Sequence, residues 1–244
     1  MQKLKIITVH KGNIDNLKIT LESTLKQSCL PYKHLIISPK LPTYFKEKFN
    51  KKIFEFIIGK DKSLYNAMNL GLKSSFDSNI FFLNSGDKFA SEHAIKYILN
   101  ELNKNQQKIL VYPVVLKYKN INFFPKKKYF LSSTYFPHPG FIRPSILQGN
   151  KKHYFSEKYM TIADGIWIKE NLKSFNYKKK FKYLIIHELG GISTIPTFSL
   201  AKEKFKKSYI EFLKEFIKIV LYKILTKPGY YKLIYINKYN FIER

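Results

Sequence analysis

Hydrophobic and polar residues follow strand-like and helix-like periods in turn along the first half of the chain. Residues 3–9 alternate between apolar and polar and are rich in β-branched side chains, a pattern typical of a strand. Across 14–27, Ile14, Leu17, Leu21 and Leu25 recur at helical spacing. The same reasoning predicts strands at 3–9, 34–38, 53–59, 79–84 and 109–118, the last broken by a proline, and helices at 14–27, 64–74 (capped by Ser63) and 91–103 (capped by Ser91).

This alternation of strands and helices predicts an α/β fold, with a mostly parallel sheet and helices on both faces. Ligands of such sheets bind beyond the carboxyl ends of the strands. Three polar turns lie at predicted strand ends and are therefore candidate site loops: His10–Asn13, Gly59–Lys62 and Asn84–Asp87.

The pattern changes after residue 120. A basic, irregular stretch precedes a proline-rich loop at 136–147 that leads into a short helix, a helix at 161–172 and a strand within 182–194. A long basic helix is predicted from Ser199 to about Thr226, ended by Pro228-Gly229. We expect one domain over 1–197, with halves at about 1–118 and 119–197, and a helical basic extension over 198–244.

Composition narrows the protein class. The 244 residues are 45% hydrophobic, 16% are aromatic, and the single cysteine, Cys29, allows no disulfide within the chain. The N-terminal apolar run is too short for a secretory signal, and no window has the length of a membrane span. We therefore expect a cytoplasmic protein.

The net charge of +27 is compatible with three interpretations: nucleic-acid binding, an anionic membrane surface, or a lysine-rich composition without specific meaning. Only Arg143 and Arg244 are arginines. Because base reading and bidentate phosphate recognition rely on arginine, we do not expect a nucleic-acid partner.

Asp87 follows a buried strand closely, at the end of the stretch Asn84-Ser85-Gly86-Asp87. A carboxylate in that position is a suitable ligand for a hard divalent cation, which typically shares its oxygen ligands with substrate phosphates. The alternative is that Asp87 only caps the turn, and the strand and the acid alone favour that alternative.

The surrounding sequence resembles family-2 inverting glycosyltransferases of the GT-A fold group. The resemblance rests on "DKSLYNAMNLGLKSS" followed by "IFFLNSGDKF", and continues in "HPGFIRPSIL", "IADGIWIKENL" and "GGIST". It covers roughly residues 3–195.

The resemblance implies a role for each matching residue. Asp87 falls on the last acid of the metal-binding motif, for Mn²⁺ or Mg²⁺, and Asp164 falls on the catalytic base. The donor side is implied to comprise Val9, His10, Asp61, Tyr65, Asn69, Asn84, Ser85 and Gly86. The active-site loop and acceptor side are implied to comprise His138, Arg143, Glu188, Gly190, Gly191 and Ser193.

Three positions depart from the family pattern. Gly86 stands where the family often has a second aspartate, and Asn66 replaces an aspartate. The segment "SPKLPTYF" around Lys40 lacks the acid that commonly recognises the base. These departures bear on donor identity and metal affinity more than on the fold.

The chemistry of sugar transfer gives Asp164 its expected role. Inversion needs one base that takes the proton of the acceptor hydroxyl, whereas retention by double displacement also needs a nucleophile. Asp164 lies at a predicted helix start, where its ionised form is favoured. A purely capping role is the alternative. His138 is either structural or a donor to a phosphate or the acceptor, Arg143 either clamps a phosphate or pins a nearby acid, and Tyr65 is more simply a packing residue.

The basic tail carries an apolar stripe at helical spacing: Tyr209, Phe212, Leu213, Phe216, Ile217, Val220 and Ile224. Packing against the domain is the default for such a stripe. Aromatic residues with lysines also describe a helix in a membrane interface, where each basic residue contributes about 1 kcal/mol near anionic lipid. We expect peripheral contact with the inner face of a bacterial inner membrane.

The sequence thus predicts an inverting glycosyltransferase that moves a sugar from a nucleotide-diphosphate donor, expected to be a UDP-sugar, to a glycan or glycolipid acceptor. The resemblance implies a role in bacterial surface glycans such as lipooligosaccharide, capsule or lipid-linked oligosaccharide. A basic nucleic-acid or anionic-polymer binder and an inactive transferase-like scaffold are the alternatives.

Overall fold

The computed structural model describes residues 2–59, 62–134, 136–147, 154–190, 194–206 and 208–243. Its first sheet has seven strands in the order β10-β6-β9-β4-β1-β2-β3. The strands are β1 (Leu4–Val9), β2 (Lys33–Ser38), β3 (Phe54–Ile58), β4 (Asn79–Phe82), β6 (Ile109–Val111), β9 (Phe141–Arg143) and β10 (Tyr177–Lys179). All neighbours pair in parallel except β9, which runs antiparallel between β4 and β6.

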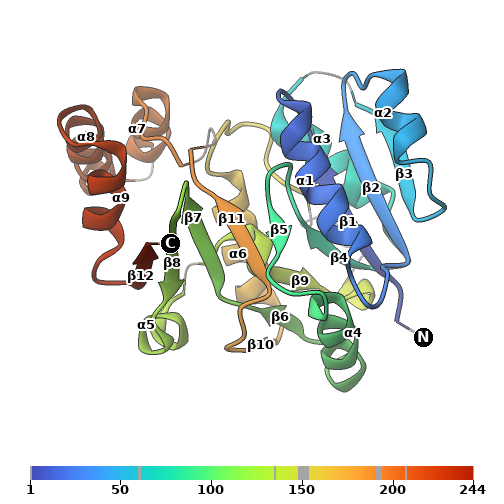
Figure 1. Ribbon diagram of the computed structural model, residues 1–244. Coiled ribbons are helices and arrows are strands. Elements are labelled where there is room, and N and C mark those ends of the chain that lie inside the picture. The colour runs from blue at the N-terminus through green and yellow to red at the C-terminus, as the bar shows by residue number, and fades with distance from the viewer. Residues whose placement is uncertain are drawn as a thin grey trace.

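Helices cover both faces of this sheet, as predicted (Figure 1). Alternate residues of a strand point to opposite faces, so Ile7 packs with one set of helices and Ile6 with the other. The helices of the Ile7 face are α3 (Leu64–Lys73), α5 (Lys127–Ser132) and α6 (Ala163–Ser174); those of the other face are α1 (Ile14–Leu25), α2 (Thr43–Lys48) and α4 (Ala94–Lys104).

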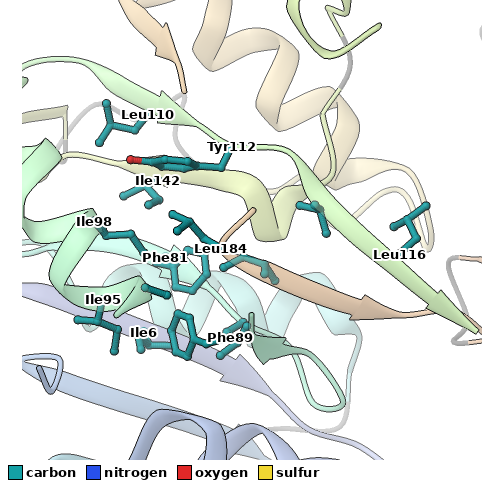
Figure 2. Close-up of a cluster of buried hydrophobic side chains, with 14 of the residues drawn as sticks. Ile6, Phe81, Phe89, Ile95, Ile98, Leu110, Tyr112, Leu116, Ile142 and Leu184 are labelled. Atoms are coloured by element: carbon teal, nitrogen blue, oxygen red, sulfur yellow. The ribbon is translucent and has the colours of Figure 1, made fainter. Parts of the chain in front are cut away.

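A second sheet, which the sequence analysis did not predict, has the strand order β12-β8-β7-β11-β5. Its strands are β5 (Lys88–Phe89), β7 (Val114–Tyr118), β8 (Ile121–Pro125), β11 (Ile185–Glu188) and β12 (Tyr239–Glu243). One hydrophobic cluster joins both sheets and α4, and Figure 2 shows its centre around Phe81, Ile98, Leu110 and Leu184. The proline break predicted within 109–118 is the point at which the chain leaves β6 and enters β7.

Several helix boundaries match the prediction, and others are corrected. Ser63 caps α3, since its side chain accepts a hydrogen bond from the Asn66 amide. Ser91 does not cap α4, which begins at Ala94 after His93. In the proline-rich segment, two short 3₁₀ helices, η1 (His138–Gly140) and η2 (Ser145–Leu147), flank β9, which was predicted to be loop.

The predicted single helix of the tail is three helices and a strand. They are α7 (Phe198–Phe205), α8 (Tyr209–Ile224), α9 (Lys227–Tyr235) and β12. Pro228 does not end a helix but lies in the first turn of α9, where its missing N–H costs nothing. The tail packs onto the second sheet, because β12 pairs with β8 and Tyr230, Tyr231 and Tyr239 enter the shared core (Figure 1).

The core also contains a histidine that is fully buried. His34 on β2 contacts Thr8 Oγ1 at 2.7 Å through Nε2 and Thr24 Oγ1 at 3.2 Å through Nδ1, which ties β1 and α1 to β2. Burial lowers the pKa of His34 to about 3, so the imidazole is neutral in the folded protein at neutral pH.

We therefore predict acid sensitivity that depends on His34. Below pH 6.5 the unfolded chain takes up a proton at His34 and the folded chain does not, so the free energy of unfolding falls as pH falls toward 3. The slope from this one group is about 1.4 kcal/mol per pH unit. In urea unfolding at pH 7, 6 and 5, the difference in unfolding free energy between the wild type and His34→Gln should shrink as the pH falls, with that slope below pH 6.5. Parallel pH profiles would contradict the prediction.

Candidate active site

The Asn84–Asp87 turn is held at the carboxyl end of β4 by the first helix. Thr20 of α1 donates its hydroxyl to the Asp87 carbonyl at 2.8 Å and accepts from the Gly86 amide at 3.0 Å. Gly86 has φ +100°, a conformation that side chains rarely adopt. The backbone of this turn therefore explains why a glycine stands where the family often has an aspartate.

Asp87 lies beside His187 because of the pairing between the two sheets. Lys88 pairs with Ile186 in the antiparallel β5–β11 ladder, and the next residues along, Asp87 and His187, contact at 2.6 Å between Oδ1 and Nδ1. Burial alone would lower the pKa of His187, but the Asp87 carboxylate outweighs it and the pKa lies above its usual value. Asp87 is only 2% exposed, and its Oδ2 has no hydrogen-bond partner among the described residues.

Asp164 lies in the first turn of α6, as predicted, and accepts several hydrogen bonds. Tyr65 of α3 donates its hydroxyl to Oδ1 at 3.2 Å, the Gly165 amide donates to Oδ1 at 2.8 Å, and His138 Nδ1 donates to Oδ2 at 3.1 Å. Burial alone would raise the pKa of Asp164, but these donors outweigh it and the pKa is lowered. Asp164 is thus an ionised carboxylate at neutral pH. In turn, burial and the Asp164 charge raise the pKa of Tyr65.

His138 connects the two acids. Its Nε2 contacts Asn84 Nδ2 at 2.9 Å, so the amide donates, Nε2 accepts, and the ring hydrogen lies on Nδ1, facing Asp164. Asn84 begins the turn that ends at Asp87, and its Oδ1 is buried without a hydrogen-bond partner within the described ranges. Asp87 and Asp164 therefore share one site, and His187 lies in the electrostatic field of both.

The position of His138 depends on a close backbone approach at Gly140. A Cβ atom at Gly140 would lie 2.2 Å from the Tyr112 carbonyl oxygen, and the Tyr112 amide donates to the Gly140 carbonyl at 2.8 Å. The helix η1 consequently lies against β4, which precedes the Asn84–Asp87 turn, and against β11 and α6, which carry His187 and Asp164.

Other predicted donor-side residues adjoin this centre or lie behind it. His10, which follows β1, contacts the Ser85 hydroxyl through Nδ1 at 2.9 Å, and burial lowers its pKa. Val9 packs in the core, and its carbonyl oxygen is 3.5 Å from the Ser85 amide nitrogen. Asp61 lies outside the described residues.

Asn69 is placed against the protein's own backbone. Its amide accepts from the Phe155 N–H at 2.8 Å and donates to the Phe155 carbonyl at 2.9 Å. Asn66, one of the departures from the family, donates to both Glu157 oxygens at 3.1 Å. An aspartate in place of Asn66 would face Glu157 with like charge, which accounts for the substitution.

Arg143 and Glu188 are not brought to the centre. Arg143 pairs with Ile80 near the start of β4, toward the opposite end from Asn84, and donates to the Leu147 carbonyl. It is buried, and burial lowers its pKa to about 10. Glu188 adjoins His187 on β11 and so points to the other face, 3.7 Å from Lys117. Its pKa is raised by burial.

The glycine-rich segment after β11 is described only in part. Gly190 has φ +102° and donates its amide to Thr194 Oγ1 at 2.8 Å. Gly191 and Ser193 lie outside the described residues, so their predicted roles stay predictions.

Sequence reasoning missed His187 as a site residue. The signal was a histidine at the end of an apolar strand pattern, "YLIIHELGG", which follows the rule that site groups lie at strand ends. The partner of that strand could not be inferred, because β5 has only two residues.

A pocket lies along the same edge of the first sheet, at the carboxyl ends of β2 and β3. It is lined by Ser38, Pro39, Lys40, Leu41, Lys46, Phe56, Ile57 and Ile58. Because adjacent strands are about 4.8 Å apart, the end of β2 lies on the order of 10 Å from the end of β4.

Comparison with known proteins shows the fold. No family model and no curated protein sequence matches the chain. Among solved structures, residues 1–349 of S. aureus TarS match with a TM-score of 0.65 at 14% identity, covering 96% of this chain and 69% of that one. The same TarS fragment in complex with UDP-GlcNAc matches with a TM-score of 0.67 at 15% identity, covering 96% and 70%. A longer TarS chain matches at 0.60 and 12%, and this chain covers 45% of it. The mixed α/β architecture with a mainly parallel sheet is that of GT-A glycosyltransferases.

We predict that Asn69 acts on stability rather than on the donor. Asn69→Ala leaves the Phe155 amide and carbonyl buried without partners, which costs about 2–3 kcal/mol of unfolding free energy. Urea unfolding should show that loss, while the folded variant binds UDP as the wild type does. Unchanged stability with weakened UDP binding would instead support a donor contact.

Proposed function

We propose that the protein is an inverting glycosyltransferase that transfers a sugar from a UDP-sugar to a hydroxyl group of a bacterial surface-glycan acceptor. The observation that carries the proposal is the single polar network in which Asp164, His138 and Asn84 lead to the turn of Asp87. The GT-A fold of the chain and the UDP-GlcNAc complex of TarS support a nucleotide-sugar donor.

Asp164 is proposed as the general base. It is ionised at neutral pH, and three donors fix its orientation, so it can accept a proton from an acceptor hydroxyl as that oxygen attacks the anomeric carbon. His138 holds the carboxylate in place through Nδ1 and is itself held by Asn84. No carboxylate is proposed as a covalent nucleophile, which is consistent with inversion.

The donor is proposed to lie across the strand ends of the first sheet. The pocket beyond β2 and β3 would take the nucleoside, and the diphosphate would extend past His10 toward Asp87. Lys40 and Lys46 line that pocket, and Lys40 lies in the segment where the family commonly has an acid.

Asp87 is proposed to hold a divalent cation, Mn²⁺ or Mg²⁺, with His187 fixing the carboxylate through Oδ1. The partnerless Oδ2 of Asp87 fits this, because a buried carboxylate oxygen without a hydrogen-bond donor needs another ligand. When bound, such an ion would neutralise the charge on the departing diphosphate. The described residues contain no group of three or more His, Cys, Asp or Glu side chains suited to a metal, so donor phosphates would complete the coordination.

We expect mutation of the proposed base to impair sugar transfer without impairing binding of the donor nucleotide. Asp164→Asn should lower sugar transfer or donor hydrolysis by about 10²- to 10⁴-fold because the proton acceptor is lost. The thermal shift produced by UDP should remain. Asp77→Asn, which changes a surface acid paired with Lys3 and Lys5, is the matched control and should keep full activity. Activity retained in Asp164→Asn would refute the assignment.

Metal binding should depend on UDP and on Asp87. With both UDP and Mn²⁺ at about 100 times their dissociation constants, the wild type should gain about 2.7 kcal/mol or more of stability. Mn²⁺ alone should give a small shift, and Asp87→Asn and His187→Asn should each reduce the joint shift. Calorimetry in which Asp87→Asn binds UDP and Mn²⁺ as tightly as the wild type would rule out this cation site.

A further inference from the structure

The outer side of α8 carries hydrophobic side chains that nothing in the described chain covers. Six of them recur at helical spacing and are between 39% and 74% exposed: Tyr209, Leu213, Phe216, Ile217, Val220 and Ile224. An amphipathic helix at the surface of a folded protein normally turns such a stripe inward. Here the helix presents the stripe outward.

A buried ion pair holds α8 in this orientation. Glu215, on the opposite side of the helix, is 2% exposed, and its Oε2 lies 2.6 Å from Lys204 Nζ and 3.2 Å from Lys218 Nζ. Rotating α8 to bury the apolar stripe would separate the buried carboxylate from the Lys204 ammonium group of α7, whereas Lys218 lies on α8 and would turn with it. The outward orientation is therefore a constrained feature of the fold.

The neighbouring helix α7 extends the same surface. Phe198 and Phe205, seven residues apart, are both exposed, and their rings lie 6.1 Å from Phe216 and 6.3 Å from Tyr209 between centroids. We call the six α8 residues together with Phe198 and Phe205 the apolar face. Figure 1 shows α7 and α8 at the side of the molecule beyond the second sheet.

Positive charge surrounds the apolar face. At 100° per residue, Lys214 and Lys223 border the α8 stripe on opposite sides, and Lys202 lies between the two phenylalanines of α7. All three lysines are exposed. From residue 198 onward the chain has eleven Lys and Arg against four Glu, and the whole chain has a net charge of +27.

This charge distribution decides between the occupants of the face. A second copy of the chain would bring two strongly positive molecules together, which charge repulsion opposes. A nucleic acid would satisfy the lysines but not the exposed aliphatic side chains. An anionic lipid surface satisfies both, because the lysines meet the headgroups and the apolar side chains enter the acyl boundary.

We propose that the apolar face of α7 and α8 binds the surface of an anionic membrane, with α8 lying in the plane of the interface. None of the helices among the described residues combines the length and apolarity that a bilayer crossing needs. The proposal goes beyond the transferase activity proposed above and does not depend on it, since membrane binding requires neither Asp87 nor Asp164.

Vesicle co-sedimentation of the full chain tests the proposal. The wild type should bind vesicles of phosphatidylcholine with phosphatidylglycerol at least tenfold more tightly than vesicles of phosphatidylcholine alone. Leu213→Ser/Ile217→Ser should weaken that binding at least tenfold. The matched control, Leu30→Ser/Phe76→Ser, removes two side chains of comparable exposure away from the face and should bind as the wild type does.

A second measurement is independent of any loss of binding. An environment-sensitive fluorophore on Ile217→Cys, in a Cys29→Ser background, should brighten and shift to the blue when anionic vesicles are added, whereas the same label on Phe76→Cys should not. Several results would overturn the proposal: no vesicle binding by the wild type, equal binding by Leu213→Ser/Ile217→Ser, or no response at position 217. Light scattering that shows a dimer which this double variant dissociates would assign the face to a second copy.

Discussion

Directly after the Asn84–Asp87 turn, the chain leaves the first sheet and forms the short strand β5, which pairs antiparallel with β11 of the second sheet. That pairing fixes the register between residues about a hundred positions apart, and it sets Asp87 against His187. The left-handed backbone of Gly86 makes the sharp change of direction between β4 and β5 feasible. The position of His138 depends on this junction too, because the helix that carries it, η1, lies against both β4 and β11.

The electrostatic character of the site follows from the partners that outweigh the effect of burial on the pKa values of Asp164 and His187. Asp164 is kept ionised by donors from α3, α6 and η1, so no single element determines its pKa. Asp87 contacts a histidine of the other sheet, His187, at 2.6 Å. Asp87 Oδ2 and the side-chain oxygen Oδ1 of Asn84 remain without donors within the described ranges, and both belong to the same turn. This is the pattern expected of a site prepared for a ligand that brings its own positive charge or donors.

The sequence predicted the part of the structure that depends on local pattern. Strands β1, β2, β3, β4 and β6 of the first sheet, the Ser63 cap and the position of Asp164 at a helix start follow from periodicity and capping chemistry, and all are observed, whereas β9 and β10 were not predicted. Strands β7 and β11 lie within predicted strands, but their assembly into a second sheet could not be predicted, because β5 has only two residues and β12 is recognised only through its partner β8. His187 was missed because the β5–β11 pairing that brings it to Asp87 could not be predicted. Arg143 was assigned to the site because the β4–β9 register, which places Arg143 near the start of β4, could not be predicted either. The tail was predicted as one helix because Phe205 and Tyr209 keep the helical spacing on either side of 206–208. The orientation of α8 is set by the contact between Glu215 and Lys204 of α7, which spacing along α8 does not reveal.

The contact between α7 and the segment before α6 gives the C-terminal region a further role. Glu203 accepts hydrogen bonds from the Met160 amide at 2.5 Å and from the amide and hydroxyl of Thr161 at 3.1 and 2.7 Å. Those residues immediately precede the helix that carries Asp164, and Ile162 at its start has no side chain that could cap it. Truncation after Pro196 would strip these backbone groups of their acceptor. The last fifth of the polypeptide therefore supports the start of the helix that carries Asp164, although Asp164, His138, Asn84 and Asp87 all lie outside it.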